Sequence, residues 1–165
     1  MRKSVFLIAL MACWIRVDAK PLPWPAATSE ALYLPFGLQW FMEMDAVKKA
    51  IVDYGPASCA EHSCRWMATV AEGTAVFELT FHAGTLVGCL LDYTLTRDAG
   101  APYLEKLEAL KRSTSEWLVR DLRDFPPQAT APHDAYSAET QDARIAVKWR
   151  QGEHSYFIRM EMKAK

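Results

Sequence analysis

The sequence has no glycine-rich phosphate-binding loop, no run of basic residues and no low-complexity segment. Its formal net charge is −1, so no long-range field draws it to nucleic acid or to an anionic membrane. After residue 20 it also lacks an apolar run long enough to cross a bilayer. These absences argue against a nucleic-acid-binding protein and against a mature membrane-spanning one.

Residue patterns typical of an active site are also missing. The four histidines are His62, His82, His133 and His154. All four lie in or beside expected turns and loops, and none stands in a recognised serine or cysteine nucleophile context. We therefore expect no enzyme activity and no cofactor.

What is present begins with an export signal in residues 1–19. Arg2 and Lys3 give a positive start, an apolar run follows, and Ala19 supplies the small residue of a cleavage site. The pattern predicts a bacterial protein that is periplasmic or secreted. In that environment disulfide bonds form and persist.

The same segment has a second interpretation. Residues 10–13, Leu-Met-Ala-Cys, resemble a bacterial lipobox, in which Cys13 would be lipidated and would begin the mature chain. The protein would then be lipid-anchored in the cell envelope. Under either interpretation the proline-rich residues 20–35 are expected to form a loop-like lead or tether, with Trp24 exposed.

Three cysteines follow the signal. Cys59 and Cys64 flank a short, turn-rich stretch and are the natural disulfide pair in an exported protein. Cys89 lies in an apolar, strand-like run, where we expect a buried free thiol. The alternative is a metal site made of Cys59, His62 and Cys64. It lacks a clear fourth ligand and the usual two-residue cysteine spacing, so we expect no bound metal.

Residues 36–98 are predicted to form a helix followed by a three-stranded meander. Val47, Ala50 and Ile51 recur on one helical face, and Gly55 with Pro56 ends the helix. Alternating apolar and polar residues predict strands at 64–70, 75–82 and 86–96, with turns at 72–74 and 83–84.

Residues 103–163 are predicted to form a long helix and a two-stranded hairpin. The helix is expected over 103–123, with strands at 143–150 and 155–163 and a polar loop at 128–142. The buried stripe of the helix is expected to contain Leu104, Leu107, Leu110, Thr114 and Trp117. The fold class is therefore α+β, with helices packed on one face of an antiparallel sheet. The unit of helix and meander occurs twice in one compact domain, and the second copy is shortened.

These patterns resemble the exported αβ-repeat proteins typified by β-lactamase inhibitor protein, and also the small lipoproteins of outer-membrane assembly. Residues 40–47, Trp-Phe-Met-Glu-Met-Asp-Ala-Val, stand where such repeats have an aromatic-glycine-methionine entry to a helix. Tyr54-Gly55 ends that helix, and two cysteines bracket the next loop. The resemblance covers residues 36–96 and, more loosely, 103–163. Phe41 replaces the family's glycine, and the second half lacks both the entry and a cysteine pair.

The resemblance implies a protein without enzymatic activity that binds other proteins, in some cases as an inhibitor. A candidate binding face is a basic strip on the last two strands. Its residues are Arg144, Lys148, Arg150, Arg159 and Lys163, with Phe157 among them, Glu161 interrupting them, and Arg65 joining from the first meander. Such a strip would meet an acidic patch on a partner. The alternative is an ordinary solvated sheet face.

We therefore expect an exported envelope protein that binds another protein, such as an envelope enzyme or a toxin, and acts as an inhibitor or immunity protein. One alternative is an accessory lipoprotein in outer-membrane maintenance. Another is a carrier of a small apolar ligand, held between helix and sheet near Met160 and Met162.

Overall fold

The computed structural model describes residues 24–28, 30–70, 73–96, 103–121, 135–151 and 155–165. The predictions for the export signal and for Cys13 lie outside these residues. The fold is α+β, with two helices, a seven-stranded antiparallel sheet and a small two-stranded sheet.

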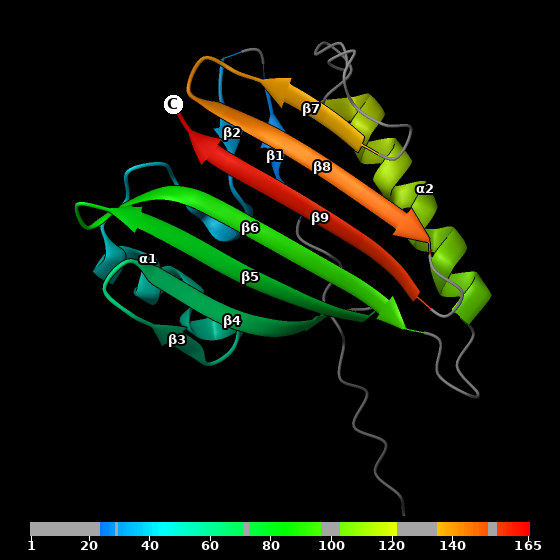
Figure 1. Ribbon diagram of the computed structural model, residues 1–165, viewed down its shortest axis with the longest axis horizontal. Helices are drawn as coiled ribbons and strands as arrows, with labels where there is room; N and C mark the ends of the chain where they lie inside the picture. The colour runs from blue at the N-terminus through cyan, green and yellow to red at the C-terminus, as the bar shows by residue number, and fades with distance from the viewer. Residues whose placement is uncertain (1–23, 29, 71–72, 97–102, 122–134, 152–154) are drawn as a thin grey trace, which may run out of the picture.

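The large sheet has the strand order β3-β4-β5-β6-β9-β8-β7 (Figure 1). Its strands are Ala57–Cys59 (β3), Ser63–Val70 (β4), Gly73–His82 (β5), Thr85–Thr96 (β6), Ala135–Glu139 (β7), Ala143–Gln151 (β8) and Ser155–Ala164 (β9). At its centre β6 pairs with β9, two strands that are far apart in the sequence. This pairing joins the two meanders into a single sheet.

The helices and the N-terminal hairpin lie on one side of this sheet. Helix α1 spans Met44–Ile51 and continues into the short 3-10 helix η2 (Val52–Tyr54), and helix α2 spans Tyr103–Asp121. The hairpin consists of β1 (Ala26–Ala27) and β2 (Leu32–Tyr33), and η1 (Pro35–Gly37) follows it. In Figure 1 these elements lie behind the sheet, and neither α1 nor α2 covers the face toward the viewer. Neither α1 nor α2 has the length and apolar character of a membrane span.

Helix α1 forms where the apolar periodicity predicts it. Val47 and Ile51 are buried one turn apart on the same helical face. Glu43 occupies the N-cap position but makes no side-chain capping bond. Instead, the backbone before the helix is hydrogen-bonded to the sheet, where the Phe41 N–H donates to the Leu86 carbonyl at 2.9 Å. The entrance to the helix is therefore fixed by the β5–β6 hairpin.

Strand β5 begins earlier than the sequence indicates. Gly73 and Thr74, expected in a turn, belong to β5 and pair with Val70 and Thr69. Backbone pairing with β4 outweighs the turn preference of glycine at this position. The other strands of the first meander begin within two residues of the predicted positions.

The expectation of a polar loop over 128–142 is wrong for its second part. Ala135–Glu139 forms β7, which pairs antiparallel with β8. Ala138 is buried, whereas Glu139 is exposed, as strand alternation requires. The segment has few β-branched residues, so its strand depends on pairing with β8 rather than on its own propensity. The second unit therefore has three strands and is not shortened to a hairpin.

The expectation of a tether over 20–35 is wrong for the described part of that segment. Leu32 is buried, and Trp24, expected to be exposed, stacks on Trp117 of α2 with ring centroids 5.1 Å apart. The Trp117 indole N–H donates to the Pro25 carbonyl. The prolines of this segment are typical of a loop, but its large apolar side chains bury enough surface to hold it against α2.

Helix α2 buries most of the predicted stripe. Leu107, Leu110 and Trp117 are at most 2% exposed. The hydroxyl of the buried Thr114 donates to the Leu110 carbonyl at 2.8 Å, which satisfies that polar group. Leu104 is 73% exposed, so the prediction for this residue is wrong. Tyr103 is buried in its place and lies four residues before Leu107, on the same helical face.

The core lies between these helices and the inner face of the sheet. Under the first meander it contains an aromatic cluster in which Trp66 of β4 stacks on Phe77 of β5 at 4.8 Å. Phe36 of η1 contacts the edge of Phe77, also at 4.8 Å. Met160 and Met162 of β9 are fully buried on the same face. Alternation in every long strand thus leaves a second, outer face for other side chains.

Candidate functional site

The candidate site is the outer face of the sheet, which neither α1 nor α2 covers (Figure 1). Its side chains alternate with the buried ones along β4, β5, β6, β8 and β9. They include Arg65, Met67, Val76, Glu78, Leu90, Asp92, Arg144, Lys148, Arg150, Phe157, Arg159, Glu161 and Lys163. We call this set the outer face.

The strand register places the predicted basic residues of β8 and β9 next to one another. Arg144 is directly opposite Lys163, and Lys148 is directly opposite Arg159. Arg150 is opposite Phe157. Directly opposite residues on one face of an antiparallel pair have Cβ atoms about 5 Å apart. These side chains therefore share one surface, on which positive charge is concentrated.

Phe157 is the centre of this surface. The guanidinium carbons of Arg150 and Arg159 lie 5.5 Å and 5.7 Å from its ring centroid. Both distances are within the range of a cation–π contact. The ring therefore presents an apolar surface flanked by two fixed cations, which is a common composition of binding hot spots.

The two arginines differ in their ionic partners. Arg159 makes a bidentate contact with Asp92, at 2.6 Å from Nε and 2.7 Å from the second nitrogen, Nη2. This hydrogen bond to Asp92 raises the pKa of the Arg159 guanidinium above its ordinary value, although burial acts in the opposite direction. Within the described part of the chain, Arg150 and Lys148 contact no carboxylate.

The far end of the strip is more nearly neutral. Arg144 pairs with Glu139 at 2.5 Å, and Lys163 pairs with Glu161 at 2.7 Å. A hollow of about 310 Å³ lies between these four side chains and the adjoining backbone. The charges of its two basic and two acidic groups cancel. This end of the strip therefore offers a partner a hollow rather than a net charge.

Arg65 lies on the same face but does not join the basic strip. It is opposite Glu78 in the pairing of β4 with β5. Strands β5 and β6 separate β4 from β9, so three strand spacings amount to about 14 Å. The sequence could place Arg65 on the correct face, but its lateral position depends on the strand order.

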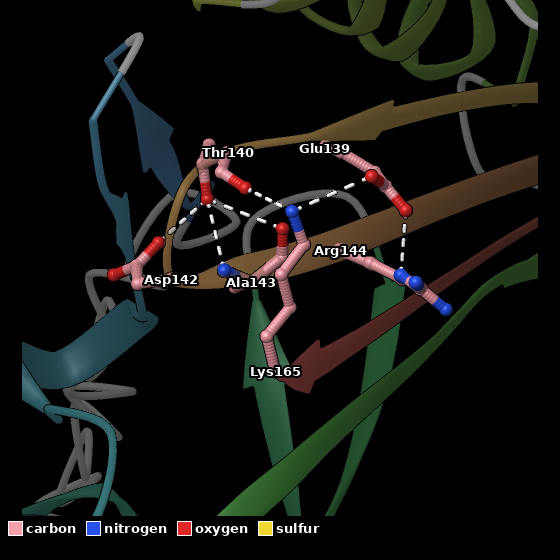
Figure 2. A network of polar contacts seen from close by, with 6 residues as sticks. All are labelled: Glu139, Thr140, Asp142, Ala143, Arg144 and Lys165. Carbon is pink, nitrogen blue, oxygen red and sulfur yellow. Dashed lines mark hydrogen bonds and ion pairs between the residues drawn. The ribbon is translucent and has the colours of Figure 1, made fainter.

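A polar network closes the β7–β8 turn at one end of the sheet (Figure 2). The Thr140 hydroxyl bonds to Asp142 Oδ1 at 2.5 Å, and the Lys165 ammonium donates to the Thr140 carbonyl. Asp142 Oδ1 also accepts the backbone N–H of Leu32 at 3.1 Å. The network therefore joins the turn to the N-terminal hairpin. Sequence analysis missed it, although threonine and aspartate two residues apart are common in such turns.

The described residues do not form the alternative metal site of Cys59, His62 and Cys64. Cys59 and Cys64 are joined in a disulfide, so their sulfur atoms are bonded to each other rather than free as thiolate ligands. His62 is exposed beside Glu61, with 3.7 Å between Nε2 and Oε1. In the described ranges no three histidine, cysteine or acidic side chains form a metal-binding group.

Two of the four histidines lie within the described residues. His82 is exposed at the end of β5, and His62 lies in the turn between β3 and β4. His133 and His154 lie outside the described residues. Both described histidines are exposed, and the Phe81 N–H donates to the His62 carbonyl at 2.9 Å, so His62 lies beside the end of β5 that carries His82.

Cys89 is a buried free thiol, as predicted. Burial raises the pKa of the Cys89 thiol from its ordinary 9.0 to about 12. The unfolded chain ionises this thiol above pH 9, but the folded chain holds it neutral until about pH 12. Its contribution to the free energy of unfolding is therefore complete below pH 9 and is lost as the pH rises from 9 to 12.

We expect urea unfolding to measure this loss. Between pH 8 and pH 10.5 the native chain should lose about 2 kcal/mol more than a Cys89→Ala variant, at about 1.4 kcal/mol per pH unit. The variant is the control for lysines and tyrosines that titrate in the same range. Equal losses in the two proteins would contradict the burial of the thiol.

Comparison of the chain with protein-family models, with curated proteins and with solved structures finds no match.

Proposed function

We propose that this protein is exported to the bacterial cell envelope and binds another protein through the outer face, as an inhibitor or immunity protein. The observation that carries the proposal is the group of Phe157, Arg150 and Lys148. It combines an aromatic ring with two cations that contact no carboxylate of the described chain. The complementary partner surface is acidic, with carboxylates placed to meet Arg150 and Lys148.

Three further features support this proposal. The Cys59–Cys64 disulfide is typical of oxidising compartments outside the cytoplasm. The repeated order of a helix followed by a meander agrees with the αβ-repeat proteins. Phe41, which stands where those repeats have glycine, has a φ of 63°, a conformation that glycine adopts freely. A positive φ at this position is compatible with the glycine that those repeats have there.

The test is site-specific photo-crosslinking in the bacterium that encodes the full chain. A photoreactive residue replaces Lys148 on the outer face, and in a matched protein it replaces Arg112, an exposed residue of α2. We expect position 148 to give one dominant protein adduct that an added Arg150→Glu change removes. Position 112 should not give this adduct.

Mass spectrometry of the adduct then identifies the partner and the contacted segment. An acidic contact surface on an envelope enzyme or a toxin is the expected result. No adduct at position 148, or the same adduct from both positions, would contradict the proposal.

A further inference from the structure

Strand β3 forms one open edge of the sheet, on the opposite side from β7 (Figure 1). Among the described residues its three positions pair with β4 alone, and Cys59 lies opposite Cys64 with a Cα–Cα distance of 4.0 Å. So short a distance identifies a pair that does not exchange backbone hydrogen bonds. Such pairs alternate along an antiparallel ladder, and Ala57 opposite Trp66 is therefore the next one.

This alternation fixes the direction of the backbone groups of β3. The N–H and C=O groups of Ala57 and Cys59 point away from β4 and toward the open edge, whereas those of Ser58 pair with Arg65. In the described part of the chain no backbone hydrogen bond from another segment reaches Ala57 or Cys59. Ala57 and Cys59 are two positions apart, and both direct their backbone N–H and C=O groups outward. An added β-strand forms its hydrogen bonds with such groups.

A groove adjoins this edge on the inner side of the sheet, below the end of α1. Its volume is about 640 Å³. The residues that line it are Lys48, Ile51, Val52, Asp53, Gly55, Pro56, Ala57 and Cys59. Val52 is 67% exposed, so a large apolar side chain faces solvent there. The side chains of a strand paired with β3 would project alternately over this groove.

The disulfide holds the edge in place although β3 buries little. All three side chains of β3 are exposed, so the strand adds almost nothing to the core by itself. Cys64, in contrast, is fully buried in β4, and its bond to Cys59 anchors the edge strand to the sheet interior. The backbone of β3 is therefore presented in fixed register, which reduces the ordering cost when a partner strand binds.

We propose that the β3 edge and its groove bind an extended segment of a partner protein by strand addition. The segment pairs its backbone with Ala57 and Cys59, and it places apolar side chains at alternate positions against Val52 and Pro56. Lys48 and Asp53, which also line the groove, provide polar contacts beside these apolar positions. This surface is separate from the outer face, so it does not depend on the function proposed above.

The test uses a displayed library of random twelve-residue peptides, selected against the full chain with its disulfide intact. Ala57→Pro removes the outward N–H of β3 and leaves the pairing of Ser58 with Arg65 intact. Val52→Asp alters the groove without touching the strand. Leu104→Asp is the matched control, because Leu104 is also an exposed apolar residue but lies on α2.

We expect selected peptides to carry apolar residues at alternating positions. Ala57→Pro and Val52→Asp should each weaken their binding at least 10-fold, while Leu104→Asp and Arg150→Glu leave it unchanged. Bound peptide should also slow hydrogen exchange at the amides of Ala57 and Cys59. Thermal unfolding confirms that each variant is folded before binding is compared.

Four outcomes would overturn the proposal. They are recovery of no peptide, equal binding to native and Ala57→Pro proteins, unchanged exchange at residues 57 and 59, and a native dimer that Ala57→Pro converts to a monomer. The last outcome would assign the edge to a second copy of this chain.

Discussion

Replacing Trp117 with alanine should lower the free energy of unfolding by about 3–5 kcal/mol, as is usual for a buried tryptophan. Trp117 is 1% exposed, stacks on Trp24 and donates its indole N–H to the Pro25 carbonyl. The substitution leaves a void under the sheet, removes the stacking partner of Trp24 and frees the N-terminal hairpin from α2. Urea unfolding followed by circular dichroism measures the change.

Leu104→Ala is the control on the same helix, because Leu104 is exposed, and its effect should stay within about 0.5 kcal/mol. Trp117→Phe keeps a ring against Trp24 but loses the hydrogen bond, so its cost should be intermediate. A loss below about 1 kcal/mol for Trp117→Ala would mean that the N-terminal segment is not packed as described.

Phe157→Ala should weaken binding of the cross-linked partner at least 30-fold, which corresponds to about 2 kcal/mol. The side chain is half-buried on the outer face between two guanidinium groups, and its removal deletes the apolar centre of the surface. Isothermal titration calorimetry with the purified partner measures the dissociation constant. The melting temperature should change little, since Phe157 lies outside the core.

Tyr33→Ala is the matched control for this experiment. Tyr33 is an aromatic residue that is 56% exposed, and it belongs to β2 of the N-terminal hairpin. Its removal should leave the dissociation constant unchanged. Equal losses of affinity for the two variants, or no loss for Phe157→Ala, would contradict a role for the ring in binding.

The sequence predicts the long strands and both helices well because each carries a strong apolar period. Val47 with Ile51, and Leu107 with Leu110, identify the buried helical faces without knowledge of the fold. The short elements lack such a period. β3 has three residues and β7 has five, and both depend on pairing with a neighbouring strand that sequence analysis cannot locate.

The candidate site is likewise predictable in part from local patterns and in part dependent on long-range strand pairing. Alternation along β8 and β9 is sufficient to place Arg144, Lys148 and Arg150 on one face, and the register then brings Phe157 and Arg159 beside them. The pairing of β6 with β9 is a long-range contact that determines two further features. It supplies Asp92 as the partner of Arg159, and it separates Arg65 from the strip. No local pattern encodes either.

The most direct test of the outer face as the binding surface is the dissociation constant of the cross-linked partner for Arg150→Glu compared with Arg112→Glu. Both variants reverse one exposed arginine, so they change the net charge equally. We predict that Arg150→Glu weakens binding at least 30-fold and that this loss shrinks as salt is raised from 50 to 500 mM, because screening weakens contacts between exposed charges. Arg112→Glu should change the dissociation constant less than about twofold. Equal effects of the two reversals would contradict the central claim that the outer face binds the partner.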